Sequence, residues 1–184
     1  ATLLVLPFDK EIERNIVRLT MVVKAINTIN TKLHVVVTPH PGADHSIDVF
    51  KRLVTYSKHP ITFSIQKESG VSTQEALSAC DIALMGNGTA NAYTAACLRT
   101  PQVCVIDPLV DLQYWKDLSG QDSWSIADMG ASALAQNAES LQRIITGLCD
   151  QGNAAMVMLQ IQERKFSRSV LEGATDRVLT LLEK

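Results

Sequence analysis

The chain has 184 residues, which at roughly 150 residues per domain predicts a single domain. It carries 17 Lys and Arg against 19 Asp and Glu, a formal net charge of -2. This balance excludes a broad basic face that would grip nucleic acid, and it excludes an acidic disordered tail. No apolar run approaches the ~20 residues of a membrane-spanning helix and no signal-peptide pattern is present, so we expect a cytoplasmic protein without a transmembrane segment.

Short apolar runs alternate along the chain with stretches that have a helical period. The runs predict strands over 3–6, 33–37, 61–65, 81–85 and 103–106, and the periodic stretches between them predict helices over 12–26, 46–57, 73–79 and 89–98. From 107 to 129 the pattern weakens, and we expect a long loop that faces a ligand or another domain, with 123–127 as a candidate sixth strand. The rest, from 137 onward, reads as helix with three apolar stripes.

Strand followed by helix, repeated, predicts an α/β fold. Parallel strands need helix-sized crossovers, and nearly continuous apolar strands are typical of a sheet covered on both faces. We therefore expect a doubly wound, mostly parallel, Rossmann-like sheet followed by C-terminal helices. The chain starts at Ala1 and enters its first strand by Leu3, which predicts a piece of a longer protein. The four cysteines all lie in or beside apolar runs, away from zinc or redox spacings, and are expected to be reduced core residues: Cys80, Cys97, Cys104 and Cys149.

One turn stands out as a candidate anion site. If the strands follow the common 3-2-1-4-5-6 order, the order reverses between the first and fourth strands, and ligands bind beside such a reversal. The turn after the fourth strand reads Gly86-Asn87-Gly88-Thr89-Ala90-Asn91 and opens a helix. Its glycines and the free N–H groups of the first helical turn suit a diphosphate, although a plain N-cap turn explains the same residues. The sequence has neither the G-x-G-x-x-G of nicotinamide and flavin sites nor a P-loop lysine.

Other polar groups follow the remaining strands. His40 lies between two prolines after the second strand and is a candidate general acid or base, or a residue that only packs. Gln66 follows the third strand, where it either meets a nucleobase or lies in a solvated loop. Asp107 and Asp111 follow the fifth strand as an acid/base pair or as loop and cap residues. His40 and its neighbours lack a third ligand at a recognisable spacing, so we expect no metal.

Three landmarks in order carry a resemblance to a known family. They are Leu4-Val5-Leu6-Pro7-x-x-Lys10, then Ala79-Cys80-Asp81-Ile82-Ala83-Leu84 leading to Gly88-Thr89-Ala90, then Thr100-Pro101 before an apolar strand. This order resembles the C-terminal, nucleotide-sugar-binding half of two-Rossmann-domain (GT-B) glycosyltransferases, and lipid-A-disaccharide synthase is the nearest family.

The resemblance implies a hexosyltransferase domain over residues 1–184 that binds a nucleotide sugar, a UDP-sugar above all, without cofactor or metal. Lys10 and the turn from Gly86 to Asn91 would hold the diphosphate, with Pro7, Phe8, Gln66 and Asp107 around the donor and His40 as the candidate catalytic group. An N-terminal acceptor-binding domain would complete the site, so the chain would be inactive alone, and any peripheral membrane contact would come through the rest of the protein.

Two departures from the family pattern keep alternatives open. Phe8 and Asp9 stand where the family has Gly and Ser, and the helix after Ala90 lacks the glutamate that holds the ribose in many such enzymes. The alternatives are a non-catalytic binding or assembly module that keeps the fold, and an enzyme like the UDP-sugar 2-epimerases.

Overall fold

A computed structural model describes residues 1–6, 12–39, 47–64, 66–86, 90–109, 111–120, 125–150, 152–167 and 172. The strands among them are β1 (Thr2–Leu6), β2 (His34–Val37), β3 (Ile61–Phe63), β4 (Ile82–Met85), β5 (Gln102–Val105) and β6 (Ala133–Ala135). The helices among them are α1 (Ile12–Ile26), α2 (Ile47–Val54), α3 (Gln66–Ser69), α4 (Thr73–Ala79), α5 (Ala90–Cys97), α6 (Asp111–Ser119), α7 (Ser125–Asp128), α8 (Ala138–Cys149) and α9 (Asn153–Phe166).

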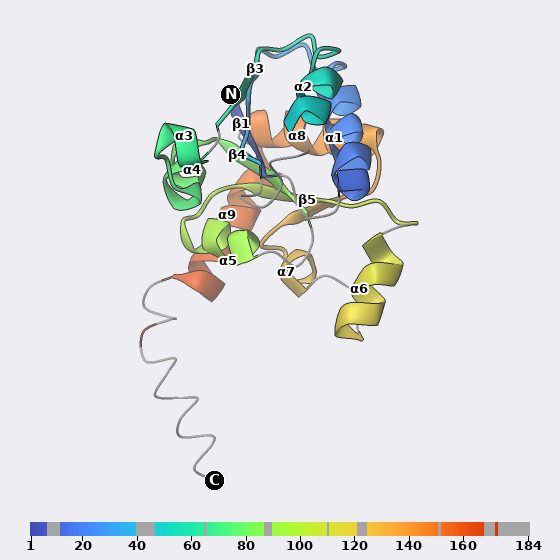
Figure 1. The fold of residues 1–184 in the computed structure, drawn as a ribbon. Helices are drawn as coiled ribbons and strands as arrows, with labels where there is room; N and C mark the ends of the chain where they lie inside the picture. The colour runs from blue at the N-terminus through green and yellow to red at the C-terminus, as the bar shows by residue number, and fades with distance from the viewer. Residues whose placement is uncertain are drawn as a thin grey trace.

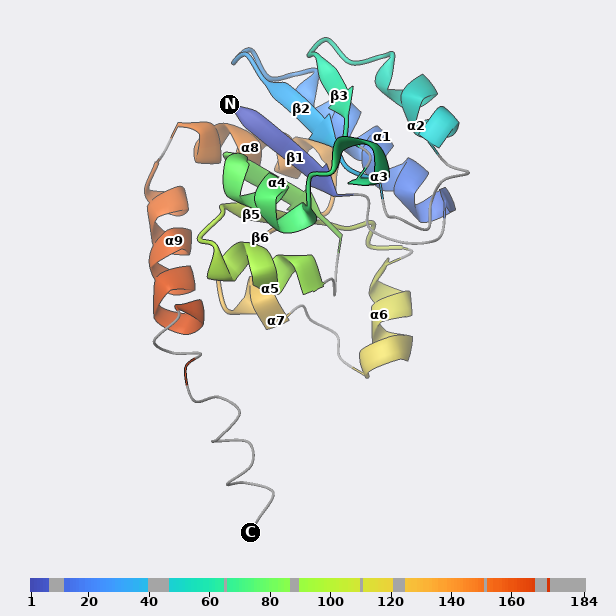
Figure 2. The same cartoon turned by 60° about the vertical axis from the view of Figure 1, so that its left-hand side comes forward.

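The described strands form one six-stranded sheet in the order β3-β2-β1-β4-β5-β6. Every neighbouring pair is parallel, and β1 lies in the middle with Leu3 beside Val35 of β2 and Ile82 of β4. This confirms the predicted α/β class and the reversal of strand order between β1 and β4. All strands therefore end at one edge of the sheet, toward the side of the molecule on which α6 lies (Figure 2).

Helices cover both faces of the sheet. Leu3 and Val5 pack in one core cluster with α1, α2 and α8, whereas Leu4 and Leu6 pack in a second cluster with α4 and α5. Figure 1 separates the two layers, with α4 and α5 on one side of the strands and α1 and α2 on the other. The alternation along β1 explains its unbroken apolar sequence, because each side chain is buried on one face or the other.

Two predictions about the region after β5 are wrong. Residues 107–129 do not form a long loop, since α6 and α7 lie within them; Leu112 and Trp115 of α6 pack against Cys104 and Ile106. The sixth strand is not 123–127, which overlaps α7, but Ala133–Ala135. Gly130, with φ +75°, turns the chain from α7 toward β6, a conformation that favours glycine.

Smaller corrections concern a loop, a cysteine and the chain end. Residues 66–69 form the short helix α3 and not a loop. The four cysteines, all within the described ranges, are free, but Cys97 is exposed and so is not the core residue expected. The last of the three apolar stripes predicted after residue 137, formed by Leu171, Ala174, Val178 and Leu182, falls outside the described residues. Within the described ranges no helix has the length and apolarity needed to cross a membrane.

Candidate functional site at the carboxyl edge of the sheet

The β4–α5 turn begins at the centre of this edge. Met85 ends β4 opposite Leu6 of β1, and the buried Gly86 follows it. The Cys104 thiol of β5 donates to the carbonyl oxygen of Gly86 at 3.6 Å. Burial raises the pKa of this thiol to about 12, so it stays protonated and remains a donor near neutral pH. The start of the turn is therefore fixed to the neighbouring strand.

Helix α5 leaves this turn with its N-terminus at the edge of the sheet. Ala90 is exposed and Asn91 half-buried, whereas Ala92, Ala95 and Ala96 are fully buried against the sheet. These small side chains let the helix backbone lie close to the strands. The first N–H groups of a helix have no partner within it and carry partial positive charge, which favours an anion near Ala90. The sequence of α5 contains no Asp or Glu that would oppose one.

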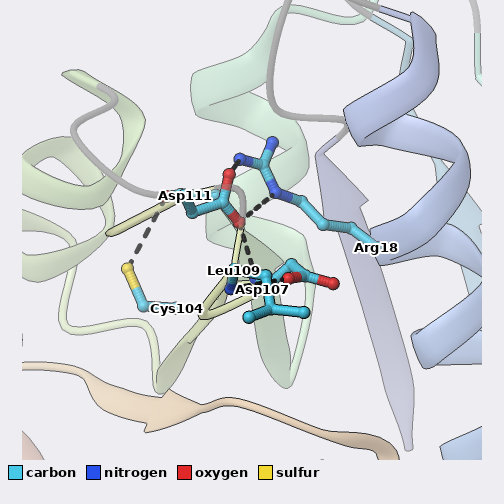
Figure 3. A network of polar contacts seen from close by, with 6 residues as sticks. Arg18, Cys104, Asp107, Leu109 and Asp111 are labelled. Carbon is cyan, nitrogen blue, oxygen red and sulfur yellow. Dashed lines mark hydrogen bonds and ion pairs between the residues drawn. The ribbon is translucent and has the colours of Figure 1, made fainter. Parts of the chain in front are cut away.

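A buried ion pair joins two elements at the same edge. Arg18 of α1 and Asp111, the first residue of α6, are 4% and 2% exposed. Arg18 Nε donates to Asp111 Oδ2 at 3.1 Å, and Nη2 donates to Oδ1, so the contact is bidentate (Figure 3). The two residues lie 93 positions apart in the sequence. Such a planar two-point contact fixes orientation as well as distance, so α6 is anchored to α1.

The carboxylate of Asp111 also shapes the loop that carries Asp107. Its Oδ2 accepts the Asp107 N–H at 2.6 Å, and the Asp111 N–H donates back to the Asp107 carbonyl at 2.7 Å. The Asp107 side chain accepts the Leu109 N–H at 2.9 Å (Figure 3). The two aspartates therefore act as loop and helix-start residues, and the alternative of an acid/base pair is wrong for Asp111, which is committed to Arg18.

A small cavity, lined in part by Asp111, lies next to this ion pair. The guanidinium of Arg14 stacks over the Tyr114 ring, 3.7 Å from its centroid, which is a second contact between α1 and α6. The cavity has a volume of about 80 Å³ and is lined by Glu13, Arg14, Val17, Asp107 and Asp111. At this volume it has room for water-sized groups and not for a nucleotide, so a larger ligand would have to lie over the edge of the sheet.

The structure places only part of the predicted site. Gly86, Ala90 and Asn91 lie at the reversal point, and Asp107 follows the adjacent strand. Gln66 begins α3, which follows the edge strand β3, and β3 is separated from β4 by β2 and β1. The other predicted residues lie outside the described ranges: Pro7, Phe8, Lys10, His40, Asn87, Gly88 and Thr89. Their roles remain predictions. Among the described residues, no group of three or more His, Cys, Asp or Glu is placed to hold a metal ion.

Sequence reasoning did not find the partner of Asp111 or the environment of Thr38. Arg18 lies beside the apolar stripe of α1, where an arginine is usually solvated, so no local signal indicates its burial. Thr38, one residue after β2, is 7% exposed. A strand-end threonine before proline is ordinary in sequence, and only the packing around it shows that it is buried.

No protein-family model matches the chain, and no curated protein matches its sequence. Solved structures do match its fold. The chain aligns over 97% of its length with MurG of Acinetobacter baumannii, with a TM-score of 0.65 and 14% identity, and over 100% with the calicheamicin glycosyltransferase CalG4, with a TM-score of 0.61 and 15% identity. It covers 52% of MurG and 42% of CalG4, so it spans about half the length of these proteins.

A third solved structure is itself a single domain. The C-terminal CMP-Kdo-binding domain of WaaA from Acinetobacter baumannii aligns with 93% of the chain and 89% of its own length, with a TM-score of 0.57 and 13% identity. At such identities the likeness shows the fold alone, an α/β, Rossmann-like domain that this chain shares with the three solved structures. The finer resemblance to lipid-A-disaccharide synthase stays a prediction.

Proposed function

We propose that this chain is the nucleotide-sugar-binding domain of a GT-B glycosyltransferase and that its donor is a UDP-sugar. The observation that supports this most directly is the position of the β4–α5 turn. It lies beside β1, where the order of an all-parallel sheet reverses, and it ends at the exposed N-terminus of α5. The fold likeness to a CMP-Kdo-binding domain over nearly the full length of both chains supports the same conclusion.

In this proposal the turn stabilises the departing diphosphate. The N–H groups at Ala90 and Asn91, together with Gly86 to Thr89, would surround the phosphate oxygens, and Lys10 would add a cation from the β1–α1 loop. Fixed dipoles of this kind stabilise charge that develops in a transition state without reorganising, so no metal is required. Asp107 would contact the sugar from the β5 side. The rest of the donor would be contacted by Gln66, Pro7 and Phe8. His40 would act as general acid or base.

A second domain completes the proposed enzyme. The chain spans about half of MurG and CalG4, which leaves an acceptor-binding domain of comparable size unaccounted for. We therefore expect residues 1–184 to bind the donor but to transfer no sugar until joined to that N-terminal domain.

Titration of the chain with UDP tests the proposal. Calorimetry should detect binding, and amide NMR should show shifts concentrated at Gly86, Ala90 and Asn91. Gly88→Leu should abolish binding because its side chain occupies the space of the phosphates, whereas Gly147→Ala in α8, where an added Cβ meets no atom within 4 Å, should leave affinity unchanged. UDP that binds equally well to the Gly88→Leu variant contradicts the proposed site.

The second candidate is a non-catalytic module. It is favoured by the absence of any carboxylate on α5, a helix that begins at the proposed site. In that case a folded wild-type chain would bind neither UDP nor CMP in the same titration.

A further inference from the structure

Thr38 continues the β1–β2 ladder by one residue beyond β2. Its N–H donates to the Val5 carbonyl at 2.9 Å, and Val5 is in register with Val37. The next position along both strands sets Thr38 beside Leu6, which in turn is in register with Met85 of β4. Thr38, Leu6 and Met85 therefore form a row across three neighbouring strands at the carboxyl edge, the row from which the β4–α5 turn begins.

The side chain of Thr38 belongs to the face of the sheet that α5 covers. Val35 and Val37 pack in the cluster beneath α1, whereas Val36 packs in the cluster of Leu6 and Met85 beneath α4 and α5. Successive strand side chains alternate between faces, so Thr38 shares the face of Val36. Its hydroxyl is thus on the α5 side of the edge and two strand spacings, about 10 Å, from β4.

This hydroxyl is buried without a hydrogen-bond partner. Thr38 is 7% exposed, and its Oγ1 accepts or donates no hydrogen bond among the described residues. Thr100, a threonine of similar burial at 4% exposed, shows the usual arrangement, because its Oγ1 donates to the Leu77 carbonyl at 3.0 Å. A buried hydroxyl is normally paired, and valine would fill the same space without the cost of burying it unpaired.

We infer that Thr38 Oγ1 hydrogen-bonds a ribose hydroxyl of the bound nucleotide; this inference rests on the proposed function. With the diphosphate at the N-terminus of α5, the pentose attached to it lies one or two strands away, and the proposed function assigns the β5 side to Asp107 and the sugar. The β1–β2 side then receives the pentose, and α5 offers no carboxylate to bind its hydroxyls. Thr38 is a donor and an acceptor at that distance and on that face.

A cycle of variants and nucleotides tests this contact. The proteins are the wild type, Thr38→Val, Thr38→Ser and the control Thr100→Val, and the ligands are UDP, 2′-deoxy-UDP and 3′-deoxy-UDP. Thr38→Val should weaken UDP binding about fivefold, the effect of one hydrogen bond. Thr38→Val should bind one of the two deoxy analogues as tightly as the wild type binds that same analogue, because the analogue lacks the ribose hydroxyl that Thr38 contacts. Thr38→Ser should keep the wild-type affinity for UDP.

Thermal unfolding separates binding from stability. Thr38→Val should melt at the same temperature as the wild type or higher, since it removes an unpaired buried hydroxyl. Thr100→Val should melt lower and bind UDP normally, because it removes the shorter of two hydrogen bonds to the Leu77 carbonyl, far from the site, and leaves only that from the Cys80 thiol at 3.4 Å. The inference is overturned if Thr38→Val binds UDP like the wild type, or if it weakens UDP and both deoxy analogues equally. A wild-type chain that binds no nucleotide refutes the proposed function itself, and the contact with it.

Discussion

Removing the carboxylate of Asp111 should cost far more than the loss of an ordinary ion pair. The carboxylate accepts two bonds from Arg18 and one from the Asp107 N–H, and both charged side chains are nearly inaccessible to water. In Asp111→Ala the buried guanidinium loses the carboxylate that accepts these two hydrogen bonds from it. We expect the free energy of unfolding to fall by about 3–5 kcal/mol, the usual cost of breaking a buried pair from one side.

Replacing both charges should be much milder. In Arg18→Met/Asp111→Leu neither of these two charges is left buried, and replacing a buried ion pair by apolar side chains is often neutral or stabilising. The Asp107 N–H loses its acceptor in this variant as it does in Asp111→Ala, so the comparison of the two isolates the effect of the buried charge. The matched control is the exposed pair between Arg99 and Glu163, at 3.0 Å and with side chains 56% and 52% exposed. Glu163→Ala should cost less than about 1 kcal/mol because water screens this pair.

Urea unfolding followed by circular dichroism and by tryptophan fluorescence measures these differences. Trp115 packs on the core side of α6, so in a Trp124→Phe background the fluorescence also reports whether α6 detaches before the rest of the chain unfolds. Two results would refute the reasoning: an Asp111→Ala variant as stable as Glu163→Ala, or a double variant as unstable as Asp111→Ala. The first would mean that the pair is solvated, and the second that packing and not charge determines the loss.

Three further predictions use other parts of the fold. In the native protein a thiol reagent should modify the exposed Cys97 rapidly. Cys104, whose pKa burial raises to about 12, should react only after unfolding in guanidinium, and mass spectrometry of the modified protein measures both reactions. Hydrogen bonds from the side chain and backbone of the N-cap Ser72 lower the pKa of Glu75 from its ordinary value of 4.5. The contribution of Glu75 to stability is therefore complete above its unfolded pKa and is lost as pH falls through the folded pKa, so Glu75→Gln should flatten the decline of the urea midpoint as pH falls below 4.5. Gly130→Ala and Gly120→Ala should each lose roughly 1–2 kcal/mol in thermal denaturation, because both glycines have positive φ. The Cβ added at position 130 meets only the terminal methyl of Ile161, at 2.8 Å, which can shift, so a loss at Gly130 several times that at Gly120 would contradict this reasoning.

The fold could be predicted from the sequence because its signals are local. The apolar runs at 3–6, 81–85 and 103–106 are long enough to identify central strands, and the helical period between them identifies the crossovers. β6 was misplaced because its sequence, Ala-Leu-Ala, is short and pairs with only one neighbour, so it carries little strand signal. α6 was not predicted because its segment is rich in polar residues and has no clear helical period of apolar ones.

Part of the candidate site could likewise be predicted from local sequence, and part of it could not. The sequence by itself predicted a buried strand, a glycine turn and a helix in this order, since turn and cap chemistry depends on adjacent residues, and the strand β4 and the helix α5 are confirmed. That Arg18 meets Asp111, and that the Thr38 hydroxyl is buried on the α5 face, were decided only by the tertiary structure. The reason is physical: burial and pairing depend on side chains that the sheet brings together from distant parts of the chain, and no local pattern records which ones will meet.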